Sequence, residues 1–102
     1  MSRVNSHGAR VKAAIIATGL DLWRIDPASV SARKIGQRVG LTHSACLYHF
    51  GTADALKDAI AAEAVRLGDP VIVPQLITAR HPAAATLSAE SRAAFLALHG
   101  SR

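Results

Sequence analysis

The sequence predicts an all-α protein built from short helices. Apolar residues recur at steps of three and four along most of the chain, which is the periodicity of a helix with one buried face. Glycine and Asp-Pro breaks interrupt this pattern, and Ser or Thr residues suited to helix capping stand beside the breaks. No alternating strand pattern, internal repeat or low-complexity tract stands out. We therefore expect helices joined by tight turns.

The first helix is predicted over residues 9–24. Its apolar stripe consists of Val11, Ala14, Ile15, Thr18 and Leu22. Gly19 weakens this helix without stopping it. Asp26 and Pro27 end it, because the residue before a proline avoids helical backbone angles.

Two shorter helices are expected next. Residues 32–39 form one of them, with Ser31 as its N-cap and Gly40 as its stop. Thr42 caps the other, which runs to about Phe50.

A fourth helix follows, capped by Thr52 and running to about Leu67. Asp54 lies in its first turn, where a negative charge interacts favourably with the helix dipole. The inner stripe of this helix is Leu56, Ala59, Ile60, Ala64 and Leu67. A Gly-Asp-Pro sequence at 68–70 terminates it.

The last third is less regular. Residues 71–80 are expected to form a short helix with Pro74 in its first turn, although the apolar run before Pro74 could instead be extended. After a His-Pro break, Ser88 caps a final helix over 89–99 that Gly100 stops. The resulting organisation is a first domain over 1–67 and a short helical extension over 68–102.

The segment 31–50 has the features of a helix-turn-helix. Two closely crossing helices need a small residue at the crossing, and Gly36 supplies it. The turn needs a residue that tolerates unusual backbone angles, and Gly40 supplies that. Apolar residues that would hold both helices to the scaffold are Ile35, Val39, Leu41, Cys46 and Phe50.

The stretch IGQRVGLTHSACLYHFGTADAL resembles the TetR family of bacterial transcriptional regulators. In that family a helix-turn-helix ends in an aromatic-His-Phe run, followed by a Gly or Pro, a capping Ser or Thr and an acidic helix start. The matching residues here are Tyr48, His49, Phe50, Gly51, Thr52 and Asp54. The resemblance covers about residues 9–67 and implies a DNA-binding domain of three to four helices.

The sequence departs from the family pattern in several places. Leu47 stands where a second aromatic is common, and Ala53 replaces a common lysine. Asp26 and Pro27 replace a glycine between the first two helices. The residues after Leu67 are too few for a buried ligand cavity of the family's usual size, which disfavours a small-molecule effector. The chain is either a minimal regulator or a fragment of a longer one.

The resemblance implies that the third helix is the recognition helix in the major groove. His43 and Ser44 would then bond base edges, Ala45 and Leu47 would touch thymine methyl groups, and Tyr48 would reach a phosphate. The alternative is an ordinary amphipathic helix with a solvated outer face. The full set of candidate DNA-binding residues is Arg33, Lys34, Thr42, His43, Ser44, Ala45, Leu47, Tyr48, His49 and Thr52.

The positive charge is concentrated in the first half of the chain. Residues 1–50 carry seven basic and two acidic side chains, whereas residues 51–102 carry five of each. Such a local excess fits a phosphate-binding surface, and it fits a solvated basic face equally well. The second helix contributes Arg33, Lys34 and Arg38. A basic arm would contain Arg3, Arg10 and Lys12, with a disordered tail as the alternative for Arg3.

Other classes of function find little support. The single cysteine, Cys46, cannot form an intramolecular disulfide. Together with His43 and His49 it lacks the four ligands of a structural zinc site, and no orienting acid accompanies a Cys-His pair. We expect no metal, no cofactor and no enzymatic activity. Aromatic residues make up only 4% of the chain, which disfavours a single-strand or RNA platform. The N-terminus lacks the apolar core of a signal peptide and no run is long enough to span a membrane, so a cytoplasmic protein is expected.

Residues 68–102 are neutral and unusually apolar. Their large apolar residues are Val71, Ile72, Val73, Leu76, Ile77, Leu87, Phe95, Leu96 and Leu98. A surplus of this kind indicates a homodimer interface, although the extension could instead fold back as extra core. The predicted function is sequence-specific binding of duplex DNA, as a dimeric repressor on an inverted-repeat operator. The alternative is a protein-interaction module, derived from a helix-turn-helix, that binds another regulator.

Overall fold

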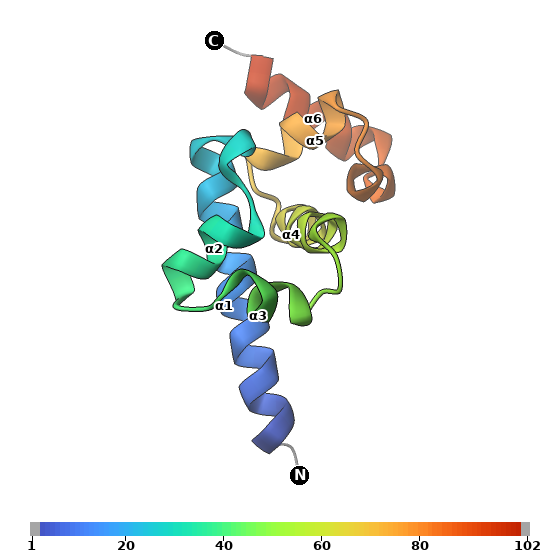
Figure 1. The fold of residues 1–102 in the computed structure, drawn as a ribbon. Helices are drawn as coiled ribbons and strands as arrows, with labels where there is room; N and C mark the ends of the chain where they lie inside the picture. Colours follow the sequence, from blue (N-terminus) through green and yellow to red (C-terminus); the bar gives the residue numbers. More distant parts are fainter. Residues whose placement is uncertain (1–2, 101–102) are drawn as a thin grey trace. The chain divides into compact units, whose positions relative to one another are not determined.

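The computed structural model describes the backbone of residues 3–100 and the side chains of residues 8–97. This part of the chain contains six α-helices, two 3-10 helices and no strand (Figure 1), which confirms the predicted all-α class. The chain divides into two compact units, Met1–Ile60 and Ala61–Arg102. We call them unit 1 and unit 2. Their boundary lies within the fourth helix, whereas the sequence placed the end of the first domain at Leu67.

Unit 1 begins with α1, Arg3–Ile25. It starts well before the predicted residue 9, because the preceding segment contains no proline and its one glycine does not stop a helix. The buried face of α1 runs through Ile15, Gly19 and Leu22, while Ala14, predicted in the stripe, is exposed. After α1 comes the 3-10 helix η1, Pro27–Ser29, which is capped by Asp26.

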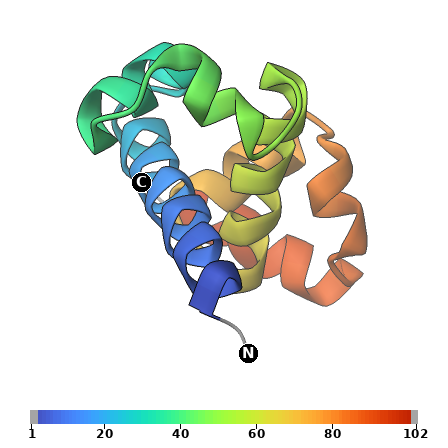
Figure 2. The same ribbon diagram turned by 60° about the horizontal axis from the view of Figure 1, so that its bottom comes forward.

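The next two helices are α2, Ala32–Val39, and α3, His43–Tyr48. The two pack against each other, and α2 packs against α1 (Figure 2). The predicted cap of α2 is confirmed, because the Ser31 hydroxyl accepts a hydrogen bond from the Lys34 amide at 3.1 Å.

The third helix ends at Tyr48, earlier than predicted. The amides of Phe50 and Gly51 both donate to the Leu47 carbonyl, at 3.0 and 2.7 Å, which tightens the chain into a turn. Gly51 then adopts a φ of 93°.

The fourth helix, α4, spans Ala53–Leu67 and is capped as predicted by Thr52, whose hydroxyl accepts from the Ala55 amide at 3.0 Å. Within unit 1, Leu56 and Ile60 are buried. Leu67 was predicted on the inner stripe, but its side chain is 52% exposed. Leu67 is the last residue of α4. The helical period predicts which face a residue lies on, but it does not predict whether another element covers that residue.

Unit 2 contains the rest of α4, followed by α5, Ile72–Thr78. The Asp69 carboxylate starts α5 by accepting hydrogen bonds from the amides of Val71 at 2.8 Å and Ile72 at 2.9 Å. The run before Pro74 is therefore helical rather than extended. Pro74 occupies the first turn, as predicted.

The predicted break after α5 is itself a short 3-10 helix, η2, Pro82–Thr86. His81 caps it, since its Nδ1 accepts from the Ala83 amide at 3.0 Å. The last helix, α6, spans Ala89–Gly100 and is capped by Ser88 as predicted. Both η2 and α6 pack against α5.

Several apolar residues of unit 2 that were expected at an interface are fully buried in the single chain: Ile72, Val73 and Leu76. Ile77, Leu87 and Phe95 are partly buried, and the side chain of Leu98 lies outside the described residues. Among the helices of the described region, none combines the length and the apolar character that crossing a membrane would require.

Candidate nucleic-acid interface

The segment 31–50 forms a compact unit of α2, a turn and α3, which we call the α2–turn–α3 unit. Gly36 lies at its tightest point. A Cβ atom on Gly36 would lie 2.6 Å from the Leu41 carbonyl oxygen, and the Leu41 amide donates to the Gly36 carbonyl at 2.8 Å. The predicted need for a small residue is thus confirmed, and the neighbour that imposes it is the backbone of the turn. Gly40 ends α2 with a φ of 79°, a left-handed conformation that favours glycine.

The inner face of the unit is apolar. Ile35 from α2 and Cys46 from α3 are fully buried, and Val39, Leu41 and Phe50 are partly buried. Burial raises the pKa of the Cys46 thiol. The thiol is therefore neutral near pH 7, and it acts as a small apolar side chain rather than a nucleophile. Among the described residues, no three His, Cys, Asp or Glu side chains gather where they could hold a metal ion.

The outer face of α3 carries polar and aromatic side chains. His43 and Ser44 are exposed in its first turn, and Tyr48 is 83% exposed at its end. Ala45 and Leu47 are only half-exposed, so they contribute less accessible surface to this face than His43, Ser44 and Tyr48 do. The face thus offers hydrogen-bond donors and acceptors at both ends with small apolar surface between them.

His49 closes the helix as its C-cap and is partly buried. Its ring meets the Tyr48 ring edge-on, with centroids 5.5 Å apart and planes at 82°. This contact supports the exposed Tyr48 ring from one side and leaves the phenol group at the surface.

Two threonine hydroxyls flank α3. The Thr42 hydroxyl accepts from the Ala45 amide at 3.0 Å, and Thr52 plays the same part at the start of α4. Both residues are exposed. A hydroxyl that accepts a hydrogen bond retains its own proton for donation. Each threonine can therefore cap a helix and bind a phosphate oxygen at the same time.

The electrostatic character of the unit is uniformly basic. Arg33, Lys34 and Arg38 are exposed on α2, and the segment 31–50 contains no acidic residue. Among the ion pairs found within the described side chains, none involves these three residues. Their charge is therefore not neutralised locally, which favours an anionic partner.

A further cation approaches the unit from α1. The Lys12 ammonium lies 5.9 Å from the centre of the Phe50 ring, within the range of a cation–π contact. The sequence placed Lys12 in a basic arm and Phe50 in the core, with no signal that linked them. Arg10 is exposed nearby in sequence, whereas the side chain of Arg3 lies outside the described residues.

Comparison of the chain with known protein families, curated proteins and solved structures finds no relative. No family model matches the chain, and neither a curated protein nor a solved structure shows significant similarity to it.

Proposed function

We propose that the protein is a sequence-specific regulator that binds duplex DNA through the α2–turn–α3 unit, in the manner of the TetR family, and acts as a repressor in the cytoplasm. The observation that carries the proposal is the fit of Gly36 against the Leu41 carbonyl. This contact fixes two short helices at close range and leaves the outer face of α3 exposed beside an acid-free basic surface.

The dimensions suit the major groove. B-DNA's major groove is about 12 Å wide and admits one α-helix, whose N-terminal residues usually contact the base edges. On α3 those residues are His43 and Ser44, both exposed. Tyr48, at the other end of the helix, would donate its hydroxyl to a phosphate. Ala45 and Leu47 would touch thymine methyl groups.

The first helix of such a motif crosses the DNA backbone. That role falls to α2, whose exposed Arg33 and Lys34 would neutralise phosphates, together with the hydroxyls of Thr42 and Thr52. Backbone contacts set register and affinity, whereas base contacts set specificity. The two helices would thus divide the two tasks between them.

The test is a salt titration of duplex binding. A preferred duplex is selected from randomised oligonucleotides, and its affinity is measured by fluorescence anisotropy over a range of salt concentrations. Binding should weaken steeply with salt, because neutralised phosphates release counterions. The double variant Arg33→Ala/Lys34→Ala should flatten the slope of log K against log salt by about 2 per protomer.

The matched control is Arg66→Gln in unit 2. Arg66 forms an ion pair with Glu63 at 2.5 Å and lies outside the α2–turn–α3 unit, so its removal should leave the slope unchanged. A double variant that binds like the parent at every salt concentration would show that α2 does not contact the backbone. Absence of any salt-dependent duplex binding would instead favour the protein-interaction module. The observation that favours the protein-interaction module is Leu47, which is half-buried and stands where the TetR family commonly has an aromatic residue.

A further inference from the structure

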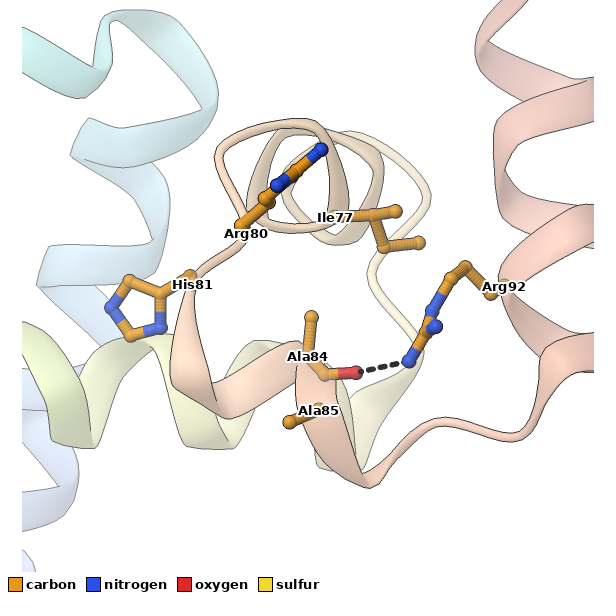
Figure 3. Close-up of a pocket in the computed structure, with 6 residues that line it drawn as sticks. All are labelled: Ile77, Arg80, His81, Ala84, Ala85 and Arg92. Atoms are coloured by element: carbon orange, nitrogen blue, oxygen red, sulfur yellow. Dashed lines mark hydrogen bonds between the residues drawn. The ribbon is translucent and has the colours of Figure 1, made fainter.

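We propose that unit 2 carries a binding site for a small organic carboxylate with an apolar body. The site is a surface pocket of about 360 Å³ lined by Ile77, Arg80, His81, Ala84, Ala85 and Arg92 (Figure 3). A pocket of this size lies at the lower end of the range that holds small organic ligands. All six residues belong to unit 2, so the proposal does not depend on DNA binding.

Arg92 is held in place by the backbone of η2 and its flank. Its Nη2 atom donates to the carbonyl oxygens of Ala84 at 3.4 Å and Leu87 at 3.3 Å. These two long hydrogen bonds use at most the two N–H groups of Nη2, so at least three of the five N–H donors of the guanidinium stay available. Figure 3 shows the Arg92 side chain reaching from α6 toward η2, with Ile77 between it and Arg80 in that view. A partly ordered fork of donors therefore faces the pocket.

Arg80 occupies a backbone position that disfavours it. Its φ is 57°, the only positive value at a non-glycine residue among those described. The amide of Arg80 donates to Ile77 and that of His81 donates to Leu76, which is the hydrogen-bond pattern of a helix C-terminus that usually has glycine at this position. An L-residue in this conformation is strained, and strain of this kind gathers at functional sites. A ligand-binding role for the Arg80 side chain would explain why arginine, rather than the favoured glycine, occupies this position.

The two guanidinium groups lack a carboxylate within the described part of the chain. No ion pair of the described side chains includes Arg80 or Arg92. Of the acids of unit 2, Glu63 pairs with Arg66, and Asp69 accepts hydrogen bonds from the amides at the start of α5. Glu90 precedes Arg92 by two residues, which places it about 200° around the helix. The lining of the pocket thus contains two arginines and no acidic side chain.

The ligand class follows from the lining. Two guanidinium forks match the geometry of a carboxylate, which each can bind through paired hydrogen bonds. Ile77, Ala84 and Ala85 provide apolar surface beside them, which an inorganic anion would leave uncovered. A small carboxylate with a compact hydrocarbon or aromatic body uses both parts of the pocket.

Benzoate is a suitable probe, and benzamide is its uncharged counterpart of the same shape. Titrations followed by amide chemical shifts should show saturable benzoate binding at Ile77, Arg80 and Ala84, with Kd on the order of 1 mM or below. Benzamide should bind more weakly by about tenfold or more, because it cannot form the charged pair. Inorganic phosphate should compete poorly, since it gains nothing from the apolar floor.

Arg80→Gly is the decisive variant. It should raise the thermal midpoint, because glycine relieves the left-handed strain, and still weaken benzoate binding by about tenfold or more. Loss of binding in a more stable protein cannot be attributed to unfolding. Arg92→Gln should also lose affinity, whereas Arg66→Gln should bind like the parent. The proposal is overturned if Arg80→Gly and Arg92→Gln bind benzoate unchanged, if benzamide binds as well as benzoate, or if phosphate displaces benzoate with equal affinity.

Discussion

At the scale of single residues, Gly36 is the position on which the candidate interface depends most. Its absent side chain lets the α2 backbone approach the Leu41 carbonyl, and a methyl group would have to displace backbone rather than a flexible side chain. We expect Gly36→Ala to lower the free energy of unfolding by about 2 kcal/mol, because overpacking at such a contact forces a backbone shift. Chemical denaturation followed by circular dichroism measures this change.

Gly8→Ala is the matched control. Gly8 also lies in a helix, but a Cβ atom there would meet nothing within 4 Å. The same substitution should therefore stabilise the protein by about 0.5–1 kcal/mol through helix propensity alone. If the two variants changed stability in the same direction, the close approach at Gly36 would not be what requires glycine.

Sequence analysis did not identify the residues that take a structural role usually filled by another residue type. His81 caps η2 through a ring nitrogen, although caps are usually sought among Ser, Thr, Asp and Asn. Arg80 adopts a left-handed conformation that sequence rules assign to glycine. Asp69 lies in the predicted Gly-Asp-Pro terminator, and the sequence gives no signal that its carboxylate also accepts hydrogen bonds from the amides of Val71 and Ile72 at the start of α5.

At the scale of elements, helix ends that carry a capping residue were predictable, whereas the start of α1, the end of α3 and the exposure of helix faces were less so. Ser31, Gly40 and Thr42 act as predicted because capping is local: each side chain or backbone angle serves residues within one turn. Leu67 shows the limit of this reasoning. It lies on the predicted stripe of α4 yet is 52% exposed, because burial depends on what packs across from a helix and not on its period.

The short helix α3 depends on its cap. Six residues cannot form a stable helix alone, so the hydrogen bond from the Ala45 amide to Thr42 matters for the position of the whole element. Thr42→Asp should keep the cap and hold stability within about 0.5 kcal/mol, since Asp is as good an N-cap as Thr. It should nevertheless weaken duplex binding by about tenfold or more, because a carboxylate replaces a hydroxyl donor beside the phosphates. Paired denaturation and anisotropy measurements separate the two effects.

Two comparison variants sharpen this test. Thr42→Ser retains both the cap and the hydroxyl, so it should leave stability and affinity close to those of the parent. Thr42→Ala removes both, with a loss of about 1 kcal/mol of stability. Full duplex affinity in Thr42→Asp would mean that Thr42 serves the fold alone and that the DNA lies elsewhere.

At the scale of the whole molecule, the sequence overestimated the apolar surface that needs a partner. Ile72, Val73 and Leu76 are buried without a second chain, because η2 and α6 pack against α5. Among the described side chains of unit 2, the large apolar residues that remain exposed are a smaller set: Leu67, Val71 and Leu96. The division into compact units falls within α4, between Ile60 and Ala61, whereas the sequence marks only where that helix ends.

We expect the protein to form a homodimer through these exposed residues, because one copy of the proposed DNA-binding unit would read too few base pairs to define a site. Leu67, Val71 and Leu96 are 52%, 43% and 39% exposed, and burying them against the same residues of a second copy would give a two-fold interface.

We expect sedimentation equilibrium at micromolar concentration to show a dimer. Replacing all three residues by Ser should raise the dimer Kd by about a hundredfold or more, since three buried side chains at about 1 kcal/mol each contribute about 3 kcal/mol. Ile25→Ser is the control, because Ile25 is 76% exposed but lies in unit 1. A strict monomer, both free and on a duplex without inverted symmetry, would contradict the dimer, and a dimer indifferent to the triple change would place the interface on another surface.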